Sequence, residues 1–125
     1  MKKIIHTDGA PGAIGPYSQA VMAGGFLFIS GQLGIDPESK ALEGSVTQQA
    51  DRALKNMGAI LKEAGLGFAD VVKVTVLLAD INDFAAVNDV YARFFESPFP
   101  ARAAYAAAGL PRGALVEIEA VAHLG

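Results

Sequence analysis

The chain has 125 residues, of which 52% are hydrophobic and 18% charged, and its formal net charge is -3 at pH 7. This composition excludes a disordered chain and favours one folded domain spanning residues 1–125. The absence of cysteine excludes disulfides, thiolate nucleophiles and cysteine-ligated metals. The sequence has no Lys/Arg cluster, which argues against a surface for nucleic acid or an anionic membrane. No apolar run is long enough to span a bilayer. Without a signal-peptide pattern in MKKIIHTDGAP, we expect a cytoplasmic protein.

The first 45 residues predict short strands separated by loops. KKIIHT (2–7) is typical of a strand, and PGAIGPY (11–17) of a loop, because Gly-Pro cannot lie inside a regular element. SQAVMAGGFLFISGQ (18–32) predicts a hairpin that turns at the Gly-Gly pair and continues as a strand over 26–29. A polar loop with Asp-Pro turn chemistry follows.

The segment between Ser45 and Ala64 predicts a helix. Ser45 is a favourable N-cap, Gln48 completes a capping box, and Gly65 supplies a stop signal. Apolar residues recur at helical spacing along one side, and charged residues occupy the other. The predicted buried side consists of Val46, Ala50, Ala53, Leu54, Met57, Ile60, Leu61 and Ala64.

Three strands and a second helix are predicted in the remaining residues. VVKVTVLL (71–78) is β-branched and short, as strands are, and residues 101–106 and 115–122 predict two more strands. We expect the helix to be capped by Asn82 or Asp83 and ended by Pro98 and Pro100. Its predicted apolar stripe is Phe84, Val87, Tyr91, Phe94 and Phe95.

The resulting order, β-β-β-α-β-α-β-β, predicts an α+β fold with a six-stranded sheet and two helices on one face. Alternation along the last strand separates Val116, Ile118 and Ala120 from Glu117, Glu119 and Val121. In VVKVTVLL, alternation predicts one apolar row of Val72, Val74, Val76 and Leu78. Since two helices cover only one face, we expect the other to meet another subunit.

Arg102 and Glu117 are charged residues inside apolar segments, which we place on adjacent strands near the second face. One interpretation is an ion pair at a subunit seam. The other is chemical: Arg can bind a carboxylate through two parallel hydrogen bonds, and a glutamate can deprotonate a water. The pair then predicts a small carboxylate substrate attacked by water.

Four further residues are candidates for the same pocket. Asn88 interrupts the apolar stripe of the second helix, so its amide either bonds a loop backbone or lines the pocket. Tyr17, in the Gly/Pro loop, and Ser30 and Gly31, at a predicted strand end, supply hydroxyls and a backbone N–H. Two distant histidines do not suggest a metal site, and no phosphate or dinucleotide motif is present, so we expect no cofactor.

Four segments resemble the RidA/YjgF family: GPYSQAV (15–21), FISGQLGIDP (28–37), DFAAVNDVYARFF (83–95) and PARAAYAAAGLPRGALVEIEAVA (100–122). Together they span most of the chain. The resemblance implies a chorismate-mutase-like fold and a homotrimer with active sites in clefts between subunits. It also implies hydrolysis of reactive 2-imino acids, such as 2-iminobutanoate and 2-iminopropanoate, to 2-keto acids and ammonia.

By the same resemblance, Arg102 binds the substrate carboxylate, Glu117 acts on the attacking water, and the pocket is lined by Tyr17, Ser30, Gly31, Asn88 and Ala104. The chain departs from the family at Ala103 and Ala104, where many members have Ser or Thr and then Cys. FFESPFPAR (94–102) is also shorter than in many relatives. Side-chain contacts after Arg102 and the rim of the cleft are therefore expected to differ.

Two alternatives belong to other functional classes. The same cleft would suit a non-catalytic protein that senses a keto acid. Some relatives are described as ribonucleases or translation inhibitors, but the net charge of -3 argues against RNA as a partner.

Overall fold

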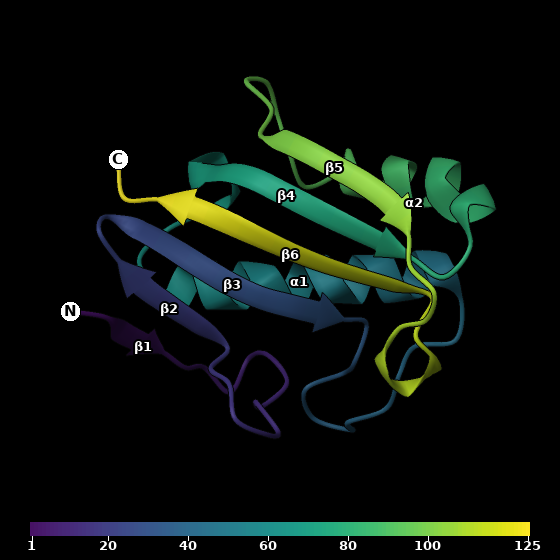
Figure 1. Ribbon diagram of the computed structural model, residues 1–125, viewed down its shortest axis with the longest axis horizontal. Helices are drawn as coiled ribbons and strands as arrows, with labels where there is room; N and C mark the ends of the chain where they lie inside the picture. The colour runs from purple at the N-terminus through teal and green to yellow at the C-terminus, as the bar shows by residue number, and fades with distance from the viewer.

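The computed structural model describes residues 1–125 as one six-stranded sheet with both helices on the same face (Figure 1). This arrangement and the order of the elements confirm the predicted α+β fold. Short 3-10 turns lie at Phe68–Asp70, Ile81–Asp83 and Pro111–Gly113. The strands and helices are β1 (Lys3–Ile5), β2 (Ala20–Ala23), β3 (Phe26–Leu33), α1 (Val46–Glu63), β4 (Val71–Leu78), α2 (Phe84–Tyr91), β5 (Ala101–Ala106) and β6 (Val116–His123).

Helix α1 forms as its sequence predicts. The Ser45 hydroxyl accepts a hydrogen bond from the Gln48 backbone N–H, and the Gln48 side chain accepts one from the Ser45 N–H. These bonds satisfy two of the N–H groups that a helix start leaves without partners. The buried side includes Leu54, Met57 and Leu61, and the helix packs on β3, β6 and α2. Neither helix combines the length and apolarity needed to cross a membrane.

The strand order, β1-β2-β3-β6-β4-β5, decides where the candidate residues lie. All neighbouring strands are antiparallel except β4 and β5, whose parallel pairing requires a crossover, and α2 lies within that crossover. β4 therefore lies between β5 and β6. The prediction that Arg102 and Glu117 lie on adjacent strands is wrong, because β5 pairs with β4 and not with β6.

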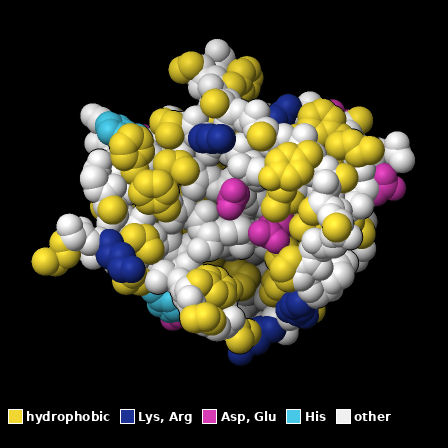
Figure 2. Space-filling view, viewed as in Figure 1, with side chains coloured by type: hydrophobic (Ala, Val, Ile, Leu, Met, Phe, Trp, Pro, Cys, Tyr) yellow, Lys and Arg dark blue, Asp and Glu magenta, His cyan; other side chains and the backbone are white.

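The two faces of the sheet differ in character, as alternation predicts. Val116, Ile118 and Ala120 of β6 are buried under the helices. The opposite face, called the open face below, carries Glu117 and Glu119. Figure 2 shows acidic side chains beside a hollow near the middle of the open face, with hydrophobic side chains gathered elsewhere on it.

A bulge in β4 makes the predicted apolar row of this strand wrong at its first residue, Val72. The pairing with β6 shifts register between Val71 and Lys73, so Val71 is buried and Val72 is 43% exposed. Val74, Val76 and Leu78 are buried as predicted. An extra residue in one strand reverses alternation locally, which period-2 counting does not detect.

Helix α2 is shorter than predicted and begins differently. It ends at Tyr91, before Phe94, Phe95 and the prolines. A 3-10 turn precedes it, and the Asp80 carboxylate caps this turn by accepting from the Asn82 N–H at 2.9 Å. Neither Asn82 nor Asp83 caps α2 through its side chain.

Candidate active site

Glu117 lies in the larger of two cavities that contain predicted site residues, a cleft of about 780 Å³ that we call the Glu117 cleft. Its walls come from the loop before β2, the second half of β3, the start of β6 and the Pro111–Gly113 turn. Tyr17, Ser30 and Gly31 line the same cleft. The cleft therefore brings together Glu117 and three of the residues predicted to lie in the same site.

The Glu117 side chain packs against Gly31, and a Cβ added at Gly31 would overlap its carboxylate. Glu117 forms no salt bridge or side-chain hydrogen bond within the chain. Burial raises the pKa of the Glu117 carboxyl above its ordinary 4.5, and the neighbouring Glu119 raises it further. A carboxyl with a raised pKa can exchange a proton with a bound water or substrate more readily than an ordinary glutamate.

Ser30 and Tyr17 present their hydroxyls differently. The Ser30 Oγ donates to the Ser18 carbonyl oxygen at 2.6 Å, so toward a ligand it can act only as an acceptor. Tyr17 is 54% exposed at the cleft wall. Ser30 and Gly31 lie inside β3, where the pairing with β6 shifts register between Ile29 and Gln32, rather than at the predicted strand end.

Arg102 lies in a second cavity of about 430 Å³, the Arg102 pocket, with Asn88, Tyr91 and Phe99 among its lining residues. Its Nη1 donates to Asn88 Oδ1 at 2.6 Å, and its guanidinium carbon lies 4.8 Å from the Tyr91 ring centroid and 5.3 Å from that of Phe84. Arg102 forms no salt bridge with any acidic residue of the chain. The Asn88 amide thus bonds Arg102, and not a loop backbone.

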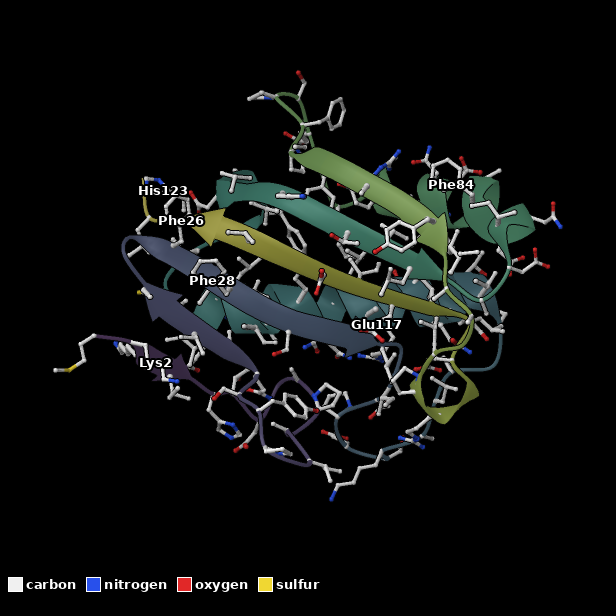
Figure 3. The ribbon with its side chains drawn as sticks, in the orientation of Figure 1. Lys2, Phe26, Phe28, Phe84, Glu117 and His123 are labelled. Carbon is white, nitrogen blue, oxygen red and sulfur yellow. The ribbon has the colours of Figure 1, made fainter.

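Within one chain, Arg102 and Glu117 do not meet. Arg102 pairs with Val74, Val74 pairs with Ala120, and Glu117 is three residues from Ala120 along β6. These strand and residue spacings separate the two Cα atoms by about 14 Å. Arg102 contacts α2 on the helix-covered side, so the prediction that it lies near the second face is wrong, whereas Glu117 lies on the open face as predicted. Figure 3 labels Phe84 of α2 and Glu117 in well-separated places.

Other residues lie differently from prediction or were not predicted for the site. Ala104 lines neither cavity and packs against the core. Phe84 and Tyr91 were predicted only as apolar stripe, although their helical spacing around Asn88 was a usable signal. Arg112 lines the Glu117 cleft and donates from Nη1 and Nη2 to the Lys40 carbonyl oxygen at 3.3 and 3.4 Å. No local pattern predicted that loop-to-loop contact.

Comparison with known proteins connects this geometry to a family. Residues 7–124 match the family model described as Endoribonuclease L-PSP. The human protein named 2-iminobutanoate/2-iminopropanoate deaminase is 59% identical over 126 aligned residues, covering 100% of this chain and 92% of the human one. The chain belongs to the RidA/YjgF family.

Solved structures of the RidA/YjgF family share the whole fold. RidA from Psychrobacter sp. PAMC 21119 superposes with a TM-score of 0.94 at 46% identity, covering 97% of this chain and 98% of that one. The YjgF gene product of E. coli gives a TM-score of 0.93 at 44% identity, with coverages of 97% and 98%. E. coli TdcF, solved with bound serine, gives 0.92 at 44% identity with the same coverages.

Proposed function

We propose that this RidA/YjgF protein hydrolyses 2-imino acids to 2-keto acids and ammonia. The observation that carries the proposal is a division of roles between two groups that lack ionic partners. Arg102 is held by α2 with donors to spare, and Glu117 lies in a cleft with a raised pKa. The deaminase names of human and goat relatives, 59% and 60% identical, support the same activity.

In the proposed reaction, the Arg102 guanidinium binds the substrate carboxylate and fixes the imine carbon in place. Glu117 accepts a proton from a water as its oxygen bonds to that carbon, and the C=N double bond becomes a single bond. The nitrogen takes up the proton that Glu117 received, which gives a neutral carbinolamine. Glu117 then carries the O–H proton to the amine nitrogen as the C–N bond breaks, so the carbonyl of the keto acid forms and ammonia leaves. Because imines already hydrolyse in water, orientation and one acid–base group suffice.

We further propose that a working site combines the Arg102 pocket of one copy with the Glu117 cleft of another, within a homotrimer. Three features support this. The two half-sites are on opposite sides of the sheet; Arg102 lies on the edge strand β5; and the open face exposes Phe28 and Tyr105. Exposed apolar area on a sheet face is typical of subunit contacts. Light scattering that gives a stable monomer at micromolar concentration would contradict the trimer.

A mixing experiment tests the shared site directly. Arg102→Ala and Glu117→Gln chains, each inactive alone, are dissociated, mixed in equal amounts and reassembled. If each site takes Arg102 from one chain and Glu117 from the next, random mixing restores about a quarter of the sites, one half times one half. No recovery after verified reassembly would mean that both groups act from the same chain.

The activity itself is tested with imines made in situ from an amino acid, by following keto acid and ammonia release above the spontaneous rate. Faster release that depends on Glu117 supports hydrolysis. Keto-acid binding without acceleration would favour the non-catalytic sensor. If a labelled RNA is cut into fragments and the cutting persists in Glu117→Gln, the ribonuclease alternative would be favoured.

The cytoplasmic location stays a prediction, which cell fractionation can test.

A further inference from the structure

Three side chains of α2 surround the Arg102 guanidinium. Phe84, Asn88 and Tyr91 are spaced i, i+4 and i+7, which places them along one side of a helix. The contacts are the Asn88 hydrogen bond of 2.6 Å and the two rings at 5.3 and 4.8 Å. The parallel pairing of β4 with β5 places α2 beside Arg102.

These contacts use only part of the hydrogen-bonding capacity of Arg102. Asn88 Oδ1 accepts a hydrogen bond from Arg102 Nη1, whereas Arg102 Nε and Nη2 donate no hydrogen bond within the chain. Nε–H and one Nη2–H point in parallel from one edge of the guanidinium, which matches the two oxygens of a carboxylate. Aromatic rings attract the cation without using any donor. The contacts with α2 thus restrain the guanidinium and leave its carboxylate-binding edge available.

The Tyr91 hydroxyl separates the role of the ring from that of its polar atom. Tyr91 is 6% exposed, and its hydroxyl has no hydrogen-bond partner. The ring stacks on Phe95 at a centroid distance of 4.4 Å and also lies near Arg102. Tyr91→Phe therefore keeps both ring contacts and removes only an unpaired buried hydroxyl.

We propose that Phe84 and Tyr91 are positioning residues for carboxylate recognition, which hold the Arg102 guanidinium, together with Asn88, so that its Nε/Nη2 edge faces the substrate. This inference rests on the proposed function for the identity of the ligand. It assigns the aromatic residues of α2 a role in substrate affinity beyond core packing. The effect acts through Arg102, so neither ring needs to touch the substrate.

The test compares two pairs of matched variants. Phe84→Leu and Tyr91→Leu remove a ring but stay apolar, whereas Phe84→Tyr and Tyr91→Phe keep one. For each we would measure KM and kcat with an imine generated in situ, the Kd of 2-oxobutanoate by NMR titration, and thermal stability. The ¹⁵N relaxation of the Arg102 Nε–H group reports whether the guanidinium stays ordered.

Each Leu variant is expected to raise KM and the 2-oxobutanoate Kd by about 2- to 5-fold, the contribution of a cation–π contact to an exposed cation. The ring-keeping variants should match the unmodified chain, and kcat should change little, because a lost carboxylate contact weakens ground state and transition state alike. The Nε–H group should become more mobile only when a ring is lost. Lower stability with unchanged KM and Kd would show that the rings serve packing alone and would overturn the proposal.

Failure of this proposal can be told apart from failure of the proposed function. If the unmodified chain binds 2-oxobutanoate with the predicted variant pattern but accelerates no hydrolysis, the positioning role stands and the enzyme proposal fails. If it hydrolyses imines and the Leu variants keep KM, Kd and Arg102 order, the positioning role is wrong. If it binds no carboxylate at all, both are overturned.

Discussion

The Arg102 pocket and the Glu117 cleft differ in how completely one chain builds them. Arg102 is held on several sides by α2, a helix that the β4–β5 crossover places beside it. Glu117 has Gly31 against its carboxylate and an open cleft around the rest, with no ionic or hydrogen-bonding partner. The Arg102 pocket is restrained by contacts within its own chain, whereas the Glu117 cleft leaves its acid–base group available for water and substrate.

The difference matches the demands of the two proposed tasks. Binding a carboxylate through two parallel bonds requires a fixed plane, because both bonds depend on the same orientation. Proton transfer requires a group whose pKa is raised toward the working pH and whose oxygens are not already bonded. Variants that affect one half-site and spare the other can therefore separate binding from chemistry.

Glu117→Gln is expected to have the largest effect on kcat. Losing a general base costs about 10²- to 10⁴-fold in rate, and we expect the loss in kcat, with KM changing little because Arg102 is untouched. Steady-state kinetics with an in situ imine measure both. A variant that retains normal kcat would show that Glu117 takes no proton from water.

Arg102→Lys should act on the other half-site. It keeps the charge but loses one of two parallel hydrogen bonds, and a charge-assisted bond contributes about 1.5–3 kcal/mol, so kcat/KM should fall roughly 10- to 150-fold. The kcat/KM of Arg102→Ala should fall further, until the rate approaches that of the uncatalysed reaction.

The oligomeric state provides the control for the Arg102 variants. If Arg102→Ala dissociates the oligomer in light scattering, or Arg102→Lys keeps full activity, the interpretation of Arg102 as an interface ion-pair partner becomes the better one.

Gly31→Ala should disturb the Glu117 cleft without unfolding the chain. The added Cβ would overlap the carboxylate end of Glu117, which can rotate away at little cost to stability. A displacement of about 1 Å can reduce catalysis by up to about 100-fold, so kcat should fall while 2-oxobutanoate still binds. Unchanged kcat together with a crystal structure showing Glu117 in place would contradict this.

The smallest expected effect is on stability against pH. Because burial and Glu119 raise the pKa of Glu117 from 4.5, the folded state binds a proton that the unfolded state has already lost. The folded chain therefore loses stability as pH rises from about 4.5 through the folded-state pKa. Glu117→Gln removes this dependence.

The Tm of the Glu117→Gln variant should exceed that of the unmodified chain at pH values above the folded-state pKa of Glu117. Below pH 4.5 the variant should have no higher Tm than the unmodified chain. Thermal melts of both proteins across pH 3.5 to about 8 measure the difference. The same advantage at every pH would mean that Glu117 has an ordinary pKa.

Local patterns in the sequence determined much of the fold. Ser45, Gln48 and the spacing of Leu54, Met57 and Leu61 specify where α1 begins and which side it buries. Alternation along β6 placed Glu117 on the face away from the helices. Such features depend on residues two to four positions apart, so the order of residues is sufficient to predict them.

Only the tertiary structure decided how the site residues are distributed. Strand order and the parallel register of β5 with β4 place Arg102 against Phe84 and Tyr91 on the helix side, two strands away from Glu117. The bulge after Val71 likewise depends on which strand lies alongside. Strand pairing joins segments distant in sequence through backbone groups that every residue carries, so side-chain patterns alone do not encode which strands become neighbours.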